Sequence, residues 1–388
     1  MTPGSFEGRA PALGAGLRSL LGRLWPGPRG RAGPAGWPAA APGQRRVLLH
    51  AGLHKTGTTA LQRFLCAAAG ELRARGVLYP AAGRSRDWPE GHHNIAWQLA
   101  GDRRCNGLVG GLDEVAAEVA AFPGDAVLSS EGLESLLGEP ARLAPLLGHP
   151  LLRGHAFTLV LWAREQASYF ESLFFELLRH RLAADAAGLC AAVLERGRLR
   201  HEDWVFHFDY AALRAGLLGL PARLEVRPYA GPAGGSAVPD FLAFAGLAPD
   251  AGPLGAERAN PRPDLAEALS LFCQGRLGGA GADWAARREA VAEVFEGRRA
   301  HLSPRLRGAL AARFADGNRR LARACGFPAE ALAIPPAPPA GSVPIEALFS
   351  QGALDTIAGL AGNDEGAADP RAAFIDAARA LLRGSGAA

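Results

Sequence analysis

Lysine is almost absent from this chain. Its 42 lysine and arginine residues comprise 41 arginines and a single lysine, Lys55. The net charge of +4 and the pI of 9.0 are therefore carried by arginine, and they fit anionic ligands without requiring nucleic acid. Because arginine supplies the positive charge everywhere else, the one lysine indicates a position that needs a compact ammonium group.

Cysteine is also sparse, and its spacing argues against a disulfide framework. The 388 residues contain no CxxC pair, and the five cysteines are scattered: Cys66, Cys105, Cys190, Cys273 and Cys325. This pattern predicts reduced thiols and a cytoplasmic location.

The chain lacks an apolar run long enough to span a membrane. The periodic piece at Leu13–Leu24 is too short for that and too interrupted for a signal peptide. We predict that residues 1–45, rich in Pro, Gly, Ala and Arg, form a disordered tail, with peripheral membrane contact as the alternative. No internal repeat is visible. Residues 46–333 should form the main domain, and 334–388 a Pro-rich linker followed by a weakly helical segment.

One stretch combines glycine, threonine and the lone lysine. Residues 47–65 read VLLHAGLHKTGTTALQRFL, which predicts a short buried strand, a turn bounded by Gly52 and Gly57, and an amphipathic helix. Strand, glycine-bearing turn and helix point backbone N–H groups at a phosphate. Lys55 adds a point charge, and the threonines add hydroxyl donors.

The order of residues in this turn departs from the Walker A pattern, because the lysine precedes TGTT instead of following a glycine. The segments HKTGTT and LQ resemble the corresponding motif in the bacterial branch of the sulfotransferase family. The resemblance implies that the loop holds the phosphosulfate end of 3′-phosphoadenosine 5′-phosphosulfate. It also implies that no metal is needed. The residues that it assigns to the donor are His54, Lys55, Thr56, Gly57, Thr58 and Thr59.

A second signal lies in residues 157–181, FTLVLWAREQASYFESLFFELLRHR. Residues 158–162 form an apolar run typical of a parallel, buried strand, and an amphipathic helix follows it. Arg164 ends the strand, and Ser172 comes eight residues later, about two helical turns at ~3.6 residues per turn. In the family that the chain resembles, an arginine and a serine with this spacing bind the 3′-phosphate of the donor.

Three residues are candidates for the proton acceptor. His92 and His93 precede a predicted helix, and Glu131 ends the predicted strand DAVLSSE at residues 125–131. Ligands gather at the carboxyl ends of strands in doubly wound sheets, so we expect Glu131 to face the reacting groups and slightly prefer it as the base. The alternatives are a capping or surface role for the histidines and a helix N-terminal carboxylate for Glu131. No third residue at ligand spacing suggests a metal.

Strands alternate with helices over residues 47–229, which predicts an α/β fold with a P-loop-type, mainly parallel sheet and helical additions towards the C-terminus. The sequence lacks the RKG-type donor loop of animal cytosolic sulfotransferases, and Arg258 and Arg262 are the candidate replacements. The resemblance implies sulfuryl transfer to a hydroxyl or amine of a small molecule, glycan or glycolipid. A P-loop kinase or NTPase, and a non-catalytic module for anionic glycans, remain the alternatives.

Overall fold

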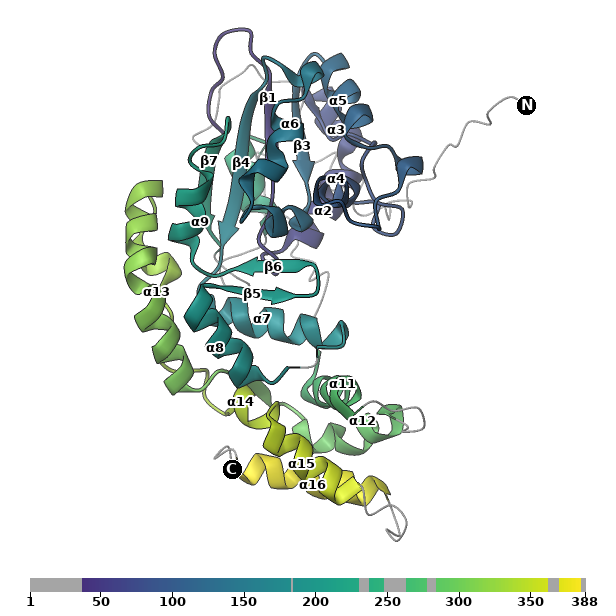
Figure 1. Ribbon diagram of the computed structural model, residues 1–388, viewed down its shortest axis with the longest axis vertical. Coiled ribbons are helices and arrows are strands. Elements are labelled where there is room, and N and C mark those ends of the chain that lie inside the picture. Colours follow the sequence, from purple (N-terminus) through teal and green to yellow (C-terminus); the bar gives the residue numbers. More distant parts are fainter. Residues whose placement is uncertain are drawn as a thin grey trace, which may run out of the picture. The chain divides into compact units, whose positions relative to one another are not determined.

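The computed structural model describes residues 37–182, 184–229, 237–247, 263–277, 284–361 and 370–384 (Figure 1). The chain divides into two compact units. The first takes in Met1–Trp162 and Leu217–Ala259, and the second takes in Ala163–Gly216 and Asn260–Ala388. Among the described residues, no helix is long and apolar enough to cross a membrane.

The first unit is built on a five-stranded parallel sheet, which confirms the predicted α/β class. Its strands, in spatial order, are β2 (Val77–Leu78), β3 (Asp125–Ser129), β1 (Arg46–His50), β4 (Ala156–Ala163) and β7 (Arg223–Pro228). β1 lies between β3 and β4, with His50 paired to Ser129 on one side and to Val160 on the other. The chain leaves β1 towards one edge of the sheet and leaves β4 towards the other. Such a reversal is where ligands bind in open α/β sheets.

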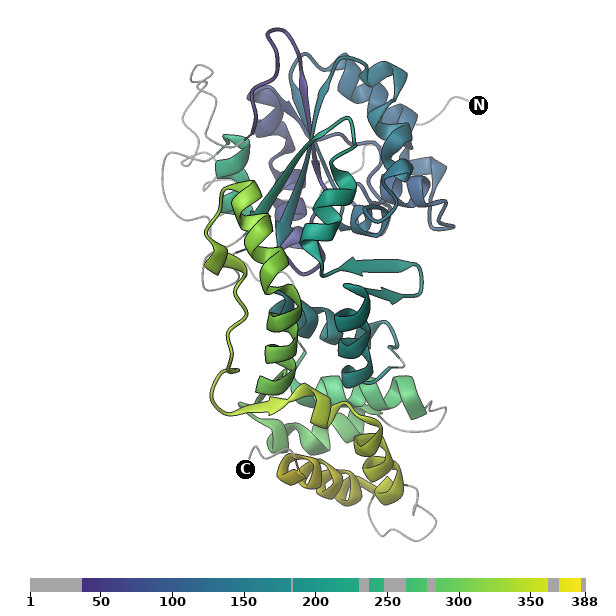
Figure 2. The same ribbon diagram turned by 60° about the vertical axis from the view of Figure 1, so that its left-hand side comes forward.

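Helices cover both faces of this sheet (Figures 1 and 2). They are α2 (Thr58–Ala67), α3 (Ala69–Ala74), α4 (His93–Ala100), α5 (Leu112–Ala121), α6 (Ala144–Leu147) and α10 (Ala237–Ala245). Short 3₁₀ helices add η1 (Gly107–Val109), η2 (Glu131–Leu136), η3 (Pro140–Leu143) and η4 (Pro150–Leu152). Helices α2, α3 and α10 bury their apolar sides in one cluster with Leu48, Val127 and Val160 of the three central strands. This packing fixes the start of α2 beside the carboxyl end of β1.

Trp37 shows that the packed part of the first unit begins no later than that residue, inside the segment predicted as a tail. Its side chain is only 2 % exposed, and its backbone N–H donates to the Phe244 carbonyl at 2.7 Å. The Arg46 guanidinium lies 4.1 Å from the centre of its ring. A buried indole with a cation on its face contributes both apolar burial and electrostatic attraction.

The second unit is mainly helical. Its helices are α7 (Gln166–Arg179), α8 (Ala186–Arg196), α9 (Tyr210–Leu217), α11 (Leu265–Leu277), α12 (Trp284–Ala292), α13 (Pro304–Cys325), α14 (Ile345–Leu348), α15 (Gln351–Ala361) and α16 (Pro370–Gly384). Shorter elements are β5 (Arg198–His201), β6 (Trp204–His207), β8 (Arg299–His301), β9 (Ser342–Pro344), η5 (Glu293–Phe295) and η6 (Ala329–Leu332). Its core gathers around Phe349, which packs its ring against Phe174, Phe175 and Phe272.

Two short sheets interrupt the helices of the second unit. The antiparallel hairpin β5–β6 follows α8, because Gly197 ends that helix in the left-handed conformation, with φ of 65°. A side chain at Gly197 would also collide with Asp209. The proline-rich linker leads into β9, which pairs in parallel with β8. No disulfide joins the five cysteines, all of which lie in described residues.

We expect Trp37→Ala to destabilise the first unit by roughly 3–5 kcal/mol, because it removes a fully buried aromatic side chain. Trp88→Ala is the matched control, since the Trp88 side chain is 56 % exposed and its loss should cost less than about 1 kcal/mol. Urea unfolding followed by circular dichroism measures both. Equal stability of the two variants would show that the packed unit does not include Trp37.

Candidate functional site

The loop between β1 and α2 contains two residues in the left-handed backbone region. Lys55 has a φ of 63° and Gly57 a φ of 83°. A non-glycine residue in this region costs roughly 1–2 kcal/mol, and such strain is found preferentially at functional sites. Left-handed residues within a turn also direct successive N–H groups into a concave, anion-binding surface. The backbone around the single lysine therefore has the geometry of an anion site.

Close packing explains both glycines of this loop. A Cβ atom on Gly52 would lie 2.6 Å from Thr58 Cγ2, and one on Gly57 would lie 2.8 Å from Ala237 Cβ in α10. Thr56 is buried, and its hydroxyl donates to the Leu53 carbonyl at 2.5 Å, which closes the turn. The Thr56 hydroxyl proton is thus used inside the loop, where the sequence had suggested a donor to a ligand.

Helix α2 begins at this loop without a capping side chain. Its N-cap is Gly57, and its first turn contains no acidic residue. The first N–H groups of a helix lack intrahelical partners and carry the positive end of the helix dipole. Thr58 and Thr59, the first two helical residues, therefore lie where an anion would be bound.

A buried carboxylate that the sequence analysis missed holds the loop. Glu134 Oε2 accepts hydrogen bonds from the His54 backbone N–H at 2.8 Å and pairs with His54 Nδ1 at 2.7 Å. The Glu134 side chain is fully buried. Burial alone would lower the pKa of His54, but the hydrogen bond and charge of Glu134 outweigh burial and raise that pKa above its ordinary value. Glu134 thus favours the protonated form of the His54 ring next to Lys55.

Glu131 and His93 lie in one cluster at the carboxyl end of β3. Glu131 Oε2 accepts from the Gln62 amide of α2 at 2.6 Å, and His93 Nδ1 pairs with Ser130 Oγ at 3.0 Å. Burial alone would raise the pKa of the Glu131 carboxyl. The charges of His93 and His54, the Glu131 backbone N–H and Gln62 together hold it below its ordinary value. Glu131 is therefore a carboxylate at neutral pH.

His92 differs from its neighbour in having both ring nitrogens bonded to backbone groups. Nδ1 accepts from the Ser129 N–H at 3.2 Å, so Nε2 carries the proton and donates to the Pro80 carbonyl at 3.1 Å. Burial, helped by the charge of Arg84, lowers its pKa to about 3. Through these two bonds, the neutral His92 ring links β3 to the segment after β2.

A second buried histidine, His50, ends β1. Its Nδ1 pairs with Ser129 Oγ at 2.8 Å, and its ring lies against Trp162 and Phe241. Burial lowers its pKa to about 4, although the charge of Glu131 opposes this shift. His50 was not among the predicted site residues, because an isolated histidine at the end of an apolar run has no distinctive spacing.

Arg164 and Ser172 belong to the second unit. Arg164 directly follows β4, and its carbonyl accepts the Tyr210 hydroxyl at 2.6 Å. The N-cap of α7 is Glu165, whose carboxylate accepts the N–H groups of Ala167 and Ser168, so the helix begins just after Arg164. Ser172 is half-buried on the second turn of α7. Arg258 and Arg262 lie outside the described residues.

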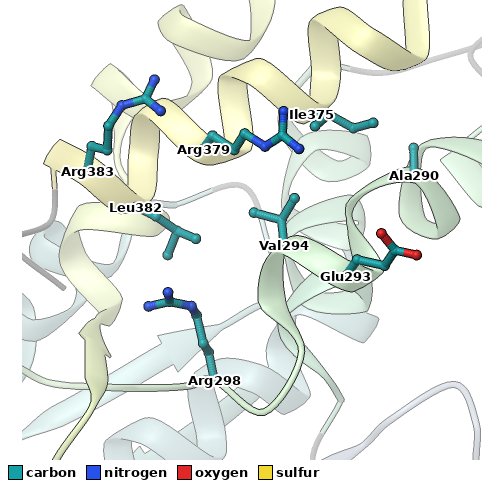
Figure 3. A pocket seen from close by; sticks show the side chains of 8 residues that line it. All are labelled: Ala290, Glu293, Val294, Arg298, Ile375, Arg379, Leu382 and Arg383. Atoms are coloured by element: carbon teal, nitrogen blue, oxygen red, sulfur yellow. The ribbon is translucent and has the colours of Figure 1, made fainter. Parts of the chain in front are cut away.

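A hollow of about 460 Å³ in the second unit contains none of the predicted site residues (Figure 3). It lies among α12, η5 and α16, with Val294, Leu382 and Arg298 around its opening. Within the described residues, no group of three His, Cys, Asp or Glu side chains is arranged to hold a metal ion.

The fold and the loop define an α/β protein whose turn after the central strand contains two left-handed residues, Lys55 and Gly57. Comparisons with protein-family models, curated proteins and solved structures find no match to the chain.

The two buried histidines give a testable pH dependence of stability. In the unfolded chain His50 and His92 take up protons near pH 6.5, but in the folded protein they do so only near pH 4 and pH 3. Between these values the unfolded state binds more protons, so the free energy of unfolding should fall by about 1.4 kcal/mol per pH unit for each histidine as the pH drops from 6.5 to 4.

Urea unfolding between pH 4.5 and 7 measures this slope. His92→Gln should reduce the slope by the contribution of one histidine, whatever its effect on stability at pH 7. An unchanged slope in His92→Gln would mean that His92 is not held neutral.

Proposed function

We propose that this protein transfers a sulfuryl group from 3′-phosphoadenosine 5′-phosphosulfate to a hydroxyl or amine acceptor, as its resemblance to bacterial sulfotransferases implies. The observation that carries the proposal is the left-handed backbone of Lys55 and Gly57 at the uncapped start of α2, on the central strand of a parallel sheet. This arrangement suits a phosphosulfate group, whose charge needs N–H donors and a nearby cation.

The loop would bind the phosphosulfate end of the donor. The first N–H groups of α2, with the hydroxyls of Thr58 and Thr59, would contact its oxygens. During transfer, the acceptor oxygen forms a bond to sulfur while the bond from sulfur to the bridging oxygen breaks. Negative charge then develops on that oxygen, and Lys55, together with His54 in its protonated form, would balance it.

Arg164 and Ser172 would bind the 3′-phosphate of the donor. The bond from Tyr210 to the Arg164 carbonyl fixes the main chain from which the guanidinium extends. An arginine fork supplies paired donors to phosphate oxygens, and a serine hydroxyl adds a third. This assignment comes from the spacing of the two residues in the sequence.

For the proton acceptor, we favour His93 over Glu131, which reverses the preference drawn from the sequence. The lowered pKa of the Glu131 carboxyl makes it a weak base, but as an anion it stabilises a protonated imidazole nearby. When Ser130 Oγ accepts the Nδ1 proton of His93, Nε2 is the nitrogen that takes the proton of the acceptor. His92 is a poor candidate, because both of its nitrogens are bonded to backbone groups.

Binding of the desulfated donor tests the proposal. Adenosine 3′,5′-bisphosphate should raise the melting temperature of the protein, because a ligand that binds only the folded state stabilises it. Arg164→Ala should weaken the bisphosphate by roughly 1.5–3 kcal/mol, while adenosine 5′-phosphosulfate, which has no 3′-phosphate, should bind nearly as before.

Calorimetric titration of both ligands gives these affinities. Equal weakening of the two ligands would make Arg164 structural. Greater stabilisation by ATP with Mg²⁺ than by the bisphosphate would instead favour a kinase or NTPase.

Kinetic measurements on variants distinguish the role of Lys55, which balances charge, from the role of the residue that accepts the proton. Lys55→Ala should lower kcat more than it weakens bisphosphate binding, because the charge that Lys55 neutralises develops only during transfer. His93→Ala should abolish the acid-side limb of the pH–rate profile, where activity rises as the base loses its proton, and leave donor binding intact. Glu131→Gln should reduce kcat and shift that limb to lower pH, because a neutral amide no longer stabilises the imidazolium. If the Glu131→Gln variant lacked this limb while the His93→Ala variant stayed active, the base would be Glu131.

A further inference from the structure

The segment from Ser85 to Gly91 is a small loop closed by its own hydrogen bonds. Ser85 Oγ donates to the Trp88 carbonyl at 3.0 Å and accepts the Trp88 N–H at 2.9 Å, and the Ser85 N–H donates to the Gly91 carbonyl at 3.3 Å. The Tyr79 hydroxyl anchors the loop to the body by donating to the Glu90 carbonyl at 2.6 Å. The backbone of Trp88 is therefore held in place, not left to move freely.

This ordered loop displays a large aromatic side chain to solvent. The Trp88 side chain is 56 % exposed. Among the described residues, the other large hydrophobic side chains that are exposed are leucines. Its ring lies 6.4 Å from that of Trp97 in α4, at an interplanar angle of 72°. Trp97 in turn lies 6.1 Å from the His93 ring, at 31°. Trp88 and Trp97, here called the tryptophan platform, thus continue from the candidate base to the surface. Trp88 provides its open face, since the Arg104 guanidinium lies 5.1 Å from the centre of the Trp97 ring.

Gly91 brings the same loop directly onto the site. A Cβ atom there would lie 2.6 Å from His93 Nε2 and 3.0 Å from Gln62 Oε1, so only glycine allows this approach. Gln62 donates to Glu131, so the loop that carries Trp88 lies beside the Gln62–Glu131–His93 cluster. A molecule resting on the tryptophan platform would have polar groups of this cluster beside it.

We propose that the tryptophan platform binds the acceptor, and that the acceptor is a pyranose ring. This inference rests on the proposed sulfuryl transfer and deepens it. The face of an indole ring carries partial negative charge, which attracts the C–H groups on one side of a sugar ring. The sugar hydroxyls would then reach the carboxylate, amide and imidazole of the neighbouring cluster, where one of them would lose its proton to His93.

The geometry favours a sugar over a flat phenol. The steep angle between Trp88 and Trp97 forms no parallel-walled slot that would enclose a planar ring on both faces. The exposure of Trp88 also leaves its face open to water, whereas an apolar acceptor gains most from an enclosed pocket. A ring with one C–H face and a hydroxyl-bearing rim fits an exposed aromatic surface bordered by polar groups.

Saturation-transfer NMR tests this assignment on the full chain saturated with adenosine 3′,5′-bisphosphate. The probes are the methyl pyranosides of glucose, galactose, mannose and N-acetylglucosamine, with 4-nitrophenol as the flat alternative. At least one glycoside should receive saturation mainly at the C–H protons of one ring face. Trp88→Ala should weaken its binding at least tenfold and raise its KM in transfer assays, with kcat within about twofold and bisphosphate affinity unchanged. Trp204→Phe, in the second unit, is the matched control and should change none of these values.

Any other outcome would contradict the proposal that the tryptophan platform binds a pyranose ring. Bisphosphate binding without any glycoside signal, a stronger signal from 4-nitrophenol, or glycoside binding unaffected by Trp88→Ala would each contradict it while leaving sulfuryl transfer standing. Failure of the bisphosphate itself to bind would contradict the proposed function, and that result is read in the same samples before any glycoside is added.

Discussion

One buried carboxylate oxygen determines the conformation of the loop at the centre of the first unit. Glu134 Oε2 binds both the backbone N–H and the ring of His54, and so ties the loop after β1 to the segment after β3. The parallel register of β1 and β3 brings the segments after the two strands together, so that His54 reaches this oxygen with both donors. The residue that follows His54 is Lys55, and its left-handed backbone is maintained by this fixed neighbour on one side and by the packed Gly57 on the other.

The same edge of the sheet separates charges in a way that suits group transfer. Glu134 raises the pKa of His54 and so favours positive charge next to Lys55, and the lowered pKa of Glu131 keeps a negative charge beside His93. In the proposed reaction, the donor would thus lie beside positive charge and the acceptor beside negative charge, within one cluster. Two buried neutral histidines, His50 and His92, both bond to Ser129 and so link the ends of β1 and β3.

The sequence alone predicted the elements whose signal is local. The apolar runs of β1 and β4 and the amphipathic α2 and α7 are visible in windows of a few residues, because burial on one or both faces leaves a periodic pattern. The pairing of β5 with β6 has no such local signal, because the start of this hairpin depends on the left-handed Gly197 and its close approach to Asp209. The bonds that shape the site were also out of reach, since His54–Glu134 joins residues 80 positions apart and Gln62–Glu131 joins residues 69 apart. No spacing rule connects such pairs before the parallel sheet has brought them together.

The most direct measurement uses the fact that Lys55 is the only lysine of the chain. Protein labelled with ¹⁵N-lysine gives a single backbone amide signal, and that signal reports on the strained loop alone. Titration with adenosine 3′,5′-bisphosphate should shift this signal along a saturating curve with the dissociation constant found by calorimetry. If calorimetry shows binding while the Lys55 amide signal stays where it was, the nucleotide binds elsewhere and the loop after β1 is not the donor site.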